Sequence, residues 1–439
     1  MTHRLQTLEQ TLLARTGRGA TYGLDRMRAA MAPLGHPERD LPAVHIAGTN
    51  GKGSTAAMVT EVARAAGLTV GTFTSPHLRR LRERIRIQGV ELDEEAFTEA
   101  LARVLHPSIP ALTFFETMTA TAFVAMREAE VDLAVVEVGL GGRLDATNVL
   151  THALATGIVS IGLDHTSILG PDEASIATEK AGIFKADTAA VLGPMSTSAL
   201  DASRRAATEA AARPVWRCGP RGTEVEVAYD DHGFDLPDGA RIDGSRIGLA
   251  GCHQRANAAV AVGLCAAVDS TRVPRRALVP HLRDGLADVR WPGRLETLSY
   301  RGRRLVLDCA HNPAGAAALR AALDDDDPRA PSERSDTLLF GAMGDKAWPS
   351  MLSTLAGRFA RRIYVPALST PLAGRTFAAP EALAARYPGR ALANPREGLA
   401  AAVATTPEGA TIVVAGSIFL VGTIRAQVTG ETEDVPVPL

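Results

Sequence analysis

A glycine-rich segment, Gly48-Thr-Asn-Gly-Lys-Gly-Ser-Thr55, constrains the fold and the chemistry of this chain more than any other feature of its sequence. It follows the apolar run Ala43–Ala47 and opens the helical pattern Ser54–Ala66, which Gly67 ends. The apolar face expected for that helix consists of Met58, Val62, Ala65 and Ala66. Glycines let backbone N–H groups approach a phosphate, a helix N-terminus favours anions, and a lysine neutralises phosphate oxygens. The succession of strand, loop and helix therefore predicts a phosphate-binding site.

The loop departs from the common spacing of such motifs. Ile46 stands where a glycine is usual, and Gly53 follows the lysine in place of serine or threonine. An ordinary strand-to-helix turn with Ser54 as the helix N-cap would also account for the glycines, but it leaves the lysine unexplained. Of the 47 basic residues only four are lysines, namely Lys52, Lys180, Lys185 and Lys346. In a chain so rich in arginine, a retained lysine indicates a need for an amine or a compact ammonium group.

Composition and charge exclude several classes of protein. The chain has 439 residues, of which 46% are hydrophobic and 22% charged, so it has ample material for a core. The formal net charge of −2 gives no field that favours nucleic acid or an anionic membrane. The four cysteines are far apart, which argues against a disulfide framework or a zinc site. Without a leader-like segment or a long apolar run, we expect a soluble cytoplasmic protein with no nucleic-acid or membrane partner.

Short apolar runs alternate with helical patterns along most of the chain, which predicts an α/β fold with largely parallel sheets. The expected strands are Ala43–Ala47, Thr69–Phe73, Leu133–Val138, Leu154–Ile161 and Ala189–Leu192, then Arg304–Leu307, Thr337–Phe340, Arg362–Val365 and Thr411–Ala415. Residues 217–251 predict a small antiparallel elaboration, and the acidic run Asp324–Asp327 before Pro328 predicts a solvated loop. Because Pro292-Gly293 breaks the pattern, we predict a larger domain over residues 1–290 and a smaller α/β domain over residues 291–439.

Polar side chains lie at the ends of three expected strands of the first domain. Glu137 lies near the end of one apolar strand, and Ser75 and His165 each follow another. A carboxylate inside a buried strand is costly unless it is paired or metal-bound. If these strands are parallel, the three groups share one edge with the Lys52 loop, where a hydroxyl, a carboxylate and an imidazole suit Mg²⁺ beside a triphosphate. Taken singly, Ser75 could be a turn residue before Pro76, and His165 a capping residue.

Two further segments of the first domain carry alternatives. Gly139-x-Gly141 resembles a dinucleotide fingerprint, but its sixth position is Leu144, which excludes a nicotinamide oxidoreductase. The segment from Pro171 to Lys185 predicts a well-formed helix with acidic residues at its start and Lys180 near its end. Lys180 either complements the helix dipole or serves as a chemically used amine, and the scarcity of lysine favours the amine.

The segment that opens the second domain also carries polar groups. Asn312 and Pro313 predict the N-cap and first position of a helix, while Asp308 and His311 are additional polar side chains at the end of the preceding strand. Arg294 and the segment Gly251–Asn257 could face the same cleft. From the residues alone, the chain is predicted to be a two-domain magnesium-nucleotide enzyme with its site at the domain junction.

Taken together, these segments resemble the folylpolyglutamate synthase/dihydrofolate synthase family, a branch of the Mur ligase superfamily. The resemblance covers nearly the whole chain in order, through Tyr22–Arg28, Ala47–Thr55, Thr74–His77, Thr113–Glu116, Glu137–Asn148, Leu163–Thr166, Glu179–Phe184, His253–Asn257, Trp291–Glu296, Asp308–Pro313, Gly344–Lys346 and Gly416–Gly422. Other Mur-type ligases share the core Gly48–Lys52, whereas the segments Gly139–Asn148 and Glu179–Lys185 are specific to the folate branch. The resemblance implies a P-loop-containing Mur-ligase-like N-terminal domain and a smaller Rossmann-like α/β C-terminal domain.

The resemblance also implies roles for individual residues. The nucleotide-binding positions would be Gly48, Thr49, Asn50, Gly51, Lys52, Gly53, Ser54, Thr55, Asn257, Arg294 and Asp308. Ser75, Glu137 and His165 would match the Mg²⁺ ligands, and Lys180 would match a lysine that is carbamylated in this family and can approach a second Mg²⁺. The pterin side would be bound by Thr113, Phe114, Phe115, Glu116, Leu144, Asp145 and Ala146. The expected catalytic residues are Lys52, Lys180 and His311.

The activity that the resemblance implies is ATP-dependent amide formation to L-glutamate through an acyl phosphate, by a monomer. The acceptor would be dihydropteroate, tetrahydrofolate polyglutamates, or both, so enzymes with one activity and with two remain alternatives. A peptidoglycan-type Mur ligase should lack the folate-branch segments. A non-catalytic nucleotide-binding protein should have lost Lys52, Glu137, His165 or Lys180, and all four are present.

Overall fold

The computed structural model describes residues 3–16, 23–244, 246–271, 276–327, 334–368, 376–432 and 434, so Tyr22 and Pro328 lie outside the described residues. The chain divides into two compact units. The first contains Met1–His77, Arg82–Gly248 and Gln254–Arg290, and the second contains Leu78–Leu81, Leu249–His253 and Trp291–Leu439. Two short segments of the earlier part of the chain thus belong to the second unit.

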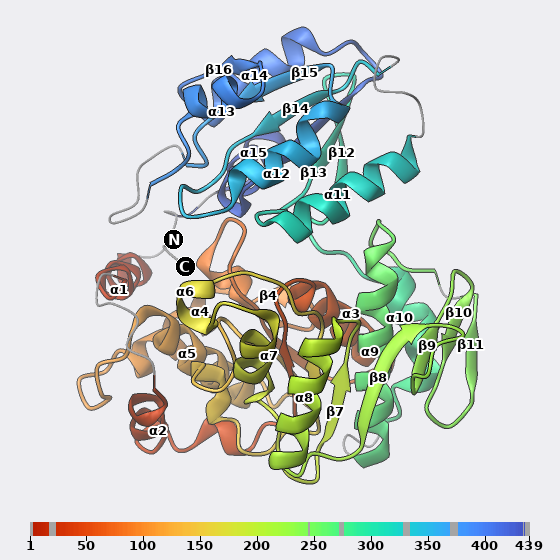
Figure 1. Ribbon diagram of the computed structural model, residues 1–439. Helices are drawn as coiled ribbons and strands as arrows, with labels where there is room; N and C mark the ends of the chain where they lie inside the picture. The colour runs from red at the N-terminus through yellow and green to blue at the C-terminus, as the bar shows by residue number, and fades with distance from the viewer. Residues whose placement is uncertain are drawn as a thin grey trace. The chain divides into compact units, whose positions relative to one another are not determined.

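The first unit is built on a single sheet with the strand order β11-β10-β9-β8-β7-β6-β1-β5-β2-β3-β4 (Figure 1). The strands are β1 Ala43–Ala47, β2 Val70–Phe73, β3 Ile85–Ile87, β4 Val90–Glu91, β5 Leu133–Glu137, β6 Ala155–Ile158, β7 Ala189–Leu192, β8 Val215–Pro220, β9 Val227–Tyr229, β10 Gly233–Asp235 and β11 Arg241–Asp243. The middle of the sheet, from β8 to β2, is parallel. Every position of β1 and β5 is buried, as is typical of parallel strands covered on both faces.

The elaboration after β8 is only partly antiparallel. As predicted, β9, β10 and β11 pair antiparallel to one another. The pair β8 and β9 is parallel, however, and joins this elaboration to the main sheet through Cys218 opposite Val227. The prediction of a small antiparallel addition was therefore wrong for its first pair.

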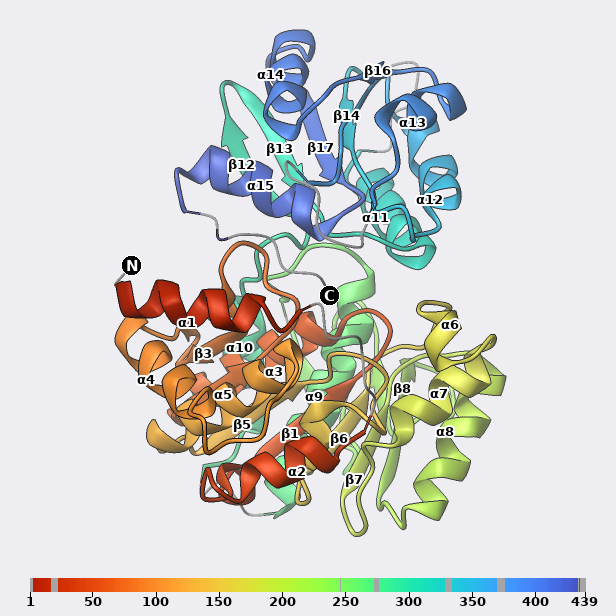
Figure 2. The same cartoon turned by 90° about the vertical axis from the view of Figure 1, so that its left-hand side faces the viewer.

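Helices flank the sheet of the first unit, as Figures 1 and 2 show. They are α1 His3–Leu13, α2 Asp25–Met31, α3 Lys52–Ala65, α4 Glu94–Val104, α5 Phe114–Glu128, α6 Thr166–Leu169, α7 Glu173–Ala181, α8 Thr197–Glu209, α9 His253–Thr271 and α10 Leu282–Asp288. Helix α3 begins two residues before the predicted start, with Gly51 as its N-cap, so Ser54 lies inside the helix rather than capping it. Ala65 is exposed, contrary to the prediction, while Met58, Val62 and Ala66 are buried.

The second unit is a smaller α/β unit whose strands lie in the order β12-β13-β17-β14-β15-β16. The strands are β12 Glu296–Tyr300, β13 Arg303–Leu307, β14 Thr337–Phe340, β15 Arg361–Tyr364, β16 Arg390–Ala391 and β17 Thr411–Ala415, and the helices are α11 Pro313–Asp326, α12 Trp348–Leu355, α13 Pro380–Arg386, α14 Pro395–Thr405 and α15 Ile418–Thr429. All pairs are parallel except β12 with β13. As predicted, Asn312 caps α11 and Pro313 is its first residue.

Both faces of this second sheet are covered, because its strand residues alternate between two cores. Leu338, Phe340 and Val413 pack with helices α11, α12 and α13, whereas Leu339 and Val414 pack with α14 and α15. This alternation follows the two-residue period of a strand. The result is the three-layer arrangement expected for a Rossmann-like unit.

The segment Leu78–Leu81 packs and hydrogen-bonds within the second unit. Leu78 packs on the core beneath α15, and a Cβ on Gly422 would collide with its carbonyl oxygen. The amide of Leu81 donates to Asp434 Oδ2 over 2.8 Å, and the amide of Asp434 donates to the Arg79 carbonyl over 2.9 Å. Backbone and apolar contacts therefore hold this segment against the C-terminal end of the chain.

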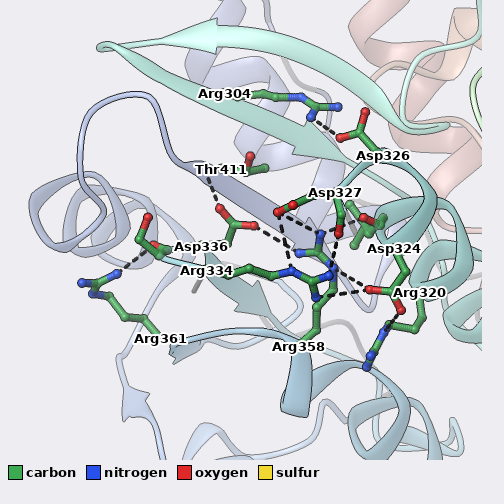
Figure 3. Close-up of polar contacts among 12 residues, drawn as sticks. Arg304, Arg320, Asp324, Asp326, Asp327, Arg334, Asp336, Arg358, Arg361 and Thr411 are labelled. Carbon is green, nitrogen blue, oxygen red and sulfur yellow. Dashed lines mark hydrogen bonds and ion pairs between the residues drawn. The ribbon is translucent and has the colours of Figure 1, made fainter. Parts of the chain in front are cut away.

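A cluster of charged side chains lies in the second unit, with its two arginines and Asp336 buried (Figure 3). This Arg358 cluster consists of Asp324, Asp327, Arg334, Asp336 and Arg358. The Arg358 side chain is 2% exposed and donates from Nη1 to Asp336 Oδ2 and from Nε to Asp324 Oδ1, both over 3.2 Å. The prediction of a loop at Asp324–Asp327 was wrong, because α11 continues to Asp326. Asp325 and Asp326 are exposed as predicted, whereas Asp324 and Asp327 are partly buried and pair with buried arginines.

Among the residues that the structure describes, no helix combines the length and the apolar character needed to cross a membrane.

Candidate active site

The strand order places the predicted motifs at one edge of the first sheet. Strands β6, β1, β5 and β2 are neighbours and run parallel. The loop Gly48–Thr55 follows β1, Glu137 ends β5, Ser75 follows β2, and the segment with His165 follows β6. Because the carboxyl ends of parallel strands meet at one edge, the four motifs share the position at which open α/β sheets bind ligands.

Glycines shape the loop after β1 and let it pass close to its neighbours. Gly51 has a φ of 83°, and a Cβ there would collide with Asn257 Oδ1 and lie 2.8 Å from Val159 Cγ1. The loop is tied to the residues after β6, because the Thr49 amide donates to the Ser160 carbonyl over 2.8 Å and the Asn50 amide donates to Ser160 Oγ over 3.1 Å. The loop is therefore rigidly held before helix α3 begins.

Lys52, the first residue of α3, extends back over this loop. Its Nζ donates to the Gly48 carbonyl over 3.0 Å and to the Thr49 carbonyl over 3.3 Å, and it lies 3.9 Å from Glu137 Oε1. The side chain is only 16% exposed. The arrangement places one ammonium group beside a helix N-terminus, where both attract phosphate oxygens.

Glu137 is 4% exposed and is satisfied by polar neighbours, as a carboxylate in a buried strand requires. The Ser75 amide donates to Glu137 Oε2 over 3.2 Å, while Lys52 faces Oε1. The structure thus brings together Ser75 and Glu137, two of the three predicted Mg²⁺ ligands. His165 lies at the same edge of the sheet, where it is the N-cap of α6 and has a φ of 51°. Its Nε2 lies 3.8 Å from Asp164 Oδ1.

Lys180 reaches the same loop from helix α7, which is shorter than the predicted segment Pro171–Lys185, with Asp172 as its N-cap and Gly182 as its C-cap. Its Nζ is buried and donates to the Gly48 carbonyl over 3.0 Å. Burial, and secondly the charge of Lys52, lower the pKa of Lys180 from 10.5 to about 7. A large fraction of this amine is therefore neutral near neutral pH, unlike an ordinary surface lysine.

The segment Gly139–Asn148 packs tightly against the end of α7 that carries Lys180. A Cβ on Gly142 would lie 2.6 Å from the Lys180 carbonyl, so glycine is required for this approach. Asn148 Nδ2 donates to the carbonyls of Arg143 and Gly182 over 3.0 Å each. Asp145 is buried, caps the short helix η3 (Ala146–Val149), and has its pKa raised chiefly by that burial.

The predicted pterin-side residues Thr113–Glu116 form the start of helix α5. Thr113 and Glu116 form a capping box, and Glu116 also pairs with Arg26 over 2.9 Å. Phe115 packs against the backbone after β5, because a Cβ on Gly139 would lie 2.7 Å from its Cε2. Phe115 therefore lies close to the segment with Leu144, Asp145 and Ala146, the other part of the predicted pterin side.

Sequence reasoning missed one residue of this region, Arg84. It is 2% exposed, donates from Nε to His77 Nδ1 over 2.9 Å, and lies 5.1 Å from the centre of the Phe114 ring. Burial lowers the pKa of Arg84 to about 10, and the charge of Glu137 acts in the opposite direction. A single arginine in an arginine-rich chain gave no signal by which to find it.

The predicted residues of the second unit form a local group of their own. Asp308 accepts the amides of Leu295 and Ala310 over 3.0 and 2.9 Å, and burial raises the pKa of its carboxyl. The charge of Arg294 opposes that rise. His311 Nδ1 lies 2.9 Å from the Cys309 carbonyl. Asn257, in the first unit, accepts from Thr55 Oγ1 at its carbonyl and packs on Gly51.

The predicted Mg²⁺ site has few protein ligands. Among the described residues, no group of three or more His, Cys, Asp or Glu side chains gathers to hold a metal ion. The predicted set has two such side chains, Glu137 and His165, with the Ser75 hydroxyl. Mg²⁺ often takes one or two protein ligands together with substrate phosphates and water, so the set fits a nucleotide-bound ion.

We expect Gly51→Ala to weaken nucleotide binding at least tenfold, because a Cβ there collides with Asn257 Oδ1 and strains a residue of positive φ. Gly222→Ala is the matched control, since Gly222 also has a positive φ, 89°, but nothing lies within 4 Å of its added Cβ. Titration of both variants with ADP measures the difference. Equal affinities in the two variants would contradict the tight fit of the loop.

Models of two protein domains match the chain. Residues 46–265 match the Mur ligase middle domain, and residues 293–418 match the Mur ligase glutamate ligase domain. A dihydrofolate synthase/folylpolyglutamate synthase of Bacillus subtilis is 38% identical over 77% of this chain and 79% of its own length.

Solved structures agree with these matches over almost the full length. Escherichia coli FolC in complex with DHPP and ADP has a TM-score of 0.82 and 31% identity, over 96% of this chain and 98% of that one. A bifunctional folylpolyglutamate synthase/dihydrofolate synthase with Mn, AMPPNP and L-glutamate bound has a TM-score of 0.82 and 30% identity, over 96% and 98% of the two chains. The chain therefore belongs to the dihydrofolate synthase/folylpolyglutamate synthase family of ATP-dependent Mur ligases.

Proposed function

We propose that this chain joins L-glutamate to dihydropteroate and to tetrahydrofolate polyglutamates, using ATP to activate the acceptor carboxylate. The observation that carries the proposal is the convergence of Lys52, Lys180 and Glu137 on the glycine loop at one sheet edge. The family membership and the relatives' names support both acceptors. We assign ATP binding to the part over residues 1–290, apart from Leu78–Leu81 and Leu249–His253, which pack with the C-terminal part over residues 291–439.

The first step transfers the γ-phosphoryl group of ATP to the acceptor carboxylate, which gives an acyl phosphate and ADP. A carboxylate does not react with an amine until it carries such a leaving group. Positioning and charge stabilisation supply most of the catalysis in phosphoryl transfer. Lys52 and the loop amides of Gly48–Thr55 would hold the triphosphate, with Asn257, Arg294 and Asp308 as further nucleotide contacts.

Ser75, Glu137 and His165 would hold Mg²⁺, and Lys180, once carbamylated, would approach a second ion. Bound there, Mg²⁺ would neutralise charge on the phosphate oxygens. The mixed set of a hydroxyl, a carboxylate and an imidazole leaves room for phosphate and water ligands. We thus propose for this chain that two ions bind, that both are magnesium, and that Lys180 carries a carbamate.

The second step joins the amino group of L-glutamate to the activated carbonyl and releases phosphate. The amine attacks the acyl carbon, the C–O bond to phosphate breaks, and a proton leaves the new amide nitrogen. No covalent enzyme nucleophile is required. His311 is the residue of the second unit that we assign to this step, and Thr113–Glu116 with Leu144–Ala146 would hold the pterin side.

Lys180 is expected to carry a carbamate that depends on pH. Because its pKa is lowered to about 7, the amine is neutral above that pH and can add CO₂ with loss of a proton. As pH falls below about 7 the amine becomes protonated and the adduct is lost. Intact-protein and peptide mass spectrometry in bicarbonate buffer across this range measures it. An unmodified Lys180 in fully active enzyme would remove the carbamate from the mechanism.

The proposed function is tested by ADP release from purified protein with Mg-ATP and L-glutamate, comparing 7,8-dihydropteroate with tetrahydrofolate. Turnover with both acceptors supports the two activities, and turnover with one assigns a single role. No turnover with either, from protein that binds nucleotide, would contradict the folate assignment. We also propose that the protein is a cytoplasmic monomer. Sedimentation of the purified protein tests its oligomeric state.

A further inference from the structure

Arg294 lies in a short turn, Gly293–Leu295, whose backbone is in the left-handed region on both sides of the arginine. Gly293 has a φ of 71°, which glycine adopts freely, whereas Leu295 has a φ of 47°, which costs a leucine free energy. The Gly293 carbonyl accepts the Cys309 amide over 2.9 Å. A strained conformation of this kind persists only where the surrounding contacts hold it. The contacts of the turn therefore show what fixes the backbone of Arg294.

Two carboxylates hold the amides of this turn, one on each side of Arg294. The Gly293 amide donates to Glu296 Oε2 over 2.9 Å. The Leu295 amide donates to Asp308 Oδ2 over 3.0 Å. Hydrogen bonds from an amide to a charged carboxylate are stronger than those between neutral groups. The two bonds together fix the backbone from which the Arg294 side chain extends.

Arg425 of helix α15 orients the first of these carboxylates. Its Nε lies 2.9 Å from Glu296 Oε1 and 3.0 Å from Glu296 Oε2, and the two side chains are only 13% and 16% exposed. Arg425 also donates from Nη1 to Glu431, near the end of the described chain. An ion pair held largely away from water is weak evidence for stability by itself, so its geometry is the informative feature. That geometry leaves Glu296 Oε2 directed at the Gly293 amide.

The guanidinium of Arg294 differs from its well-bonded backbone. Among the residues that the structure describes, it has no hydrogen-bond or ion-pair partner. Its charge nevertheless acts on two neighbours, because it lowers the pKa of His253, which burial already brings to about 4, and opposes the rise in the pKa of Asp308. A guanidinium carries five donors in a planar fork that matches phosphate oxygens. A fixed backbone beneath such a group is the arrangement that binding an anion requires.

We propose that Glu296 and Arg425 are positioning residues, which hold the turn Gly293–Leu295 so that Arg294 meets the phosphates of the nucleotide. This inference rests on the nucleotide site of the proposed function and adds two residues to it. Arg425 orients Glu296, and Glu296 holds the Gly293 amide. Without this pair the strained turn relaxes, and the Arg294 side chain must be ordered when the nucleotide binds, which weakens binding.

Titration of the full-length protein with ADP tests the proposal, because it requires no acceptor. Glu296→Ala should weaken ADP binding about tenfold. Arg425→Met should weaken it only about threefold, since Glu296 then still accepts the Gly293 amide, and Glu296→Gln, which keeps an oxygen for that amide, should also stay within about threefold. Arg304→Met is the matched control, because Arg304 of the same hairpin forms an exposed pair with Asp326, and its affinity should stay within about twofold of the wild type.

Arg294→Ala distinguishes positioning from a general loss of stability. Alone it should weaken ADP binding at least about tenfold, and adding Glu296→Ala or Arg425→Met should weaken it by no more than about twofold further, because both act through the side chain already removed. Multiplying effects would overturn the proposal, as would a wild-type affinity in Arg294→Ala or Glu296→Ala. If Glu296→Ala does not fold, Arg425→Met with and without Arg294→Ala decides it. A wild type that binds ADP but turns over neither pterin acceptor would instead contradict the proposed function.

Discussion

Replacing Lys52 by alanine is expected to lower glutamate-dependent ATP turnover about a thousandfold, since removing one preorganised charge donor costs phosphoryl and acyl transfer enzymes this order of rate. Lys52 Nζ is held on the Gly48 and Thr49 carbonyls, which places its charge at the N-terminal end of helix α3. The loss should fall mainly on kcat, because charge on the transferring phosphoryl group is greatest in the transition state.

Arg64→Ala is the matched control for Lys52→Ala. Arg64 lies on the same helix, α3, and its exposed side chain pairs with Glu61. Its removal should leave turnover within about twofold of the wild type, because exposed ion pairs contribute little. ADP release under saturating substrates measures both variants, and the thermal midpoint of each excludes misfolding. Turnover in Lys52→Ala within tenfold of the wild type would show that the lysine is not part of the phosphoryl-transfer site.

Replacing Arg358 by methionine is expected to destabilise the second unit by about 3–5 kcal/mol, because it leaves a buried carboxylate without its charged partner. Asp336 is 3% exposed and would keep only the Thr411 amide, which donates to Oδ1 over 3.0 Å. The change also removes the bond from Arg358 Nη2 to the Leu323 carbonyl at 2.8 Å. The Arg358–Asp336 contact joins the segment after α12 to the residue before β14 (Figure 3). The bond to Leu323 joins the same segment to helix α11.

Arg304→Met provides the comparison for this prediction. Arg304 pairs with Asp326 at the surface, with both side chains at least 40% exposed, so its loss should cost less than about 1 kcal/mol. Chemical denaturation followed by tryptophan fluorescence of the second unit measures both. Adding Asp336→Asn to Arg358→Met should recover part of the loss, because asparagine still accepts the Thr411 amide but carries no charge. Equal stability of Arg358→Met and Arg304→Met would contradict a cohesive role for the cluster.

The motifs that meet at one edge of the first sheet could be predicted from the sequence, because parallel strands place their carboxyl ends on the same side. Once apolar runs alternate with helices, the residues that follow consecutive strands come to one side, as Ser75 and Glu137 do. The close approach of Lys180 to Gly48 could not be derived from spacing, since 132 residues separate the two. Only the scarcity of lysine and the resemblance pointed to it. The roles of all the predicted site residues stay predictions.

The failures have physical causes of the same kind. The run Asp324–Asp327 predicts a solvated loop, but Asp324 and Asp327 are partly buried because they pair with Arg334 and Arg358, which lie elsewhere in the sequence. The early start of α3 followed from Gly51, whose left-handed φ makes it the N-cap in place of a side-chain cap. Local sequence patterns thus predict helices and strands, whereas contacts with residues distant in the sequence determine which side chains are buried.

The membership of Leu78–Leu81 in the second unit has a consequence for how the protein is made. During synthesis this segment leaves the ribosome long before its partners Gly422 and Asp434. The second unit can therefore complete its packing only after a loop of roughly 200 or more residues closes, an entropic cost that grows slowly with loop length. A fragment that starts at Trp291 would lack this segment, together with Leu249–His253. Because each unit is made of more than one stretch of chain, a single cut cannot separate one unit from the other.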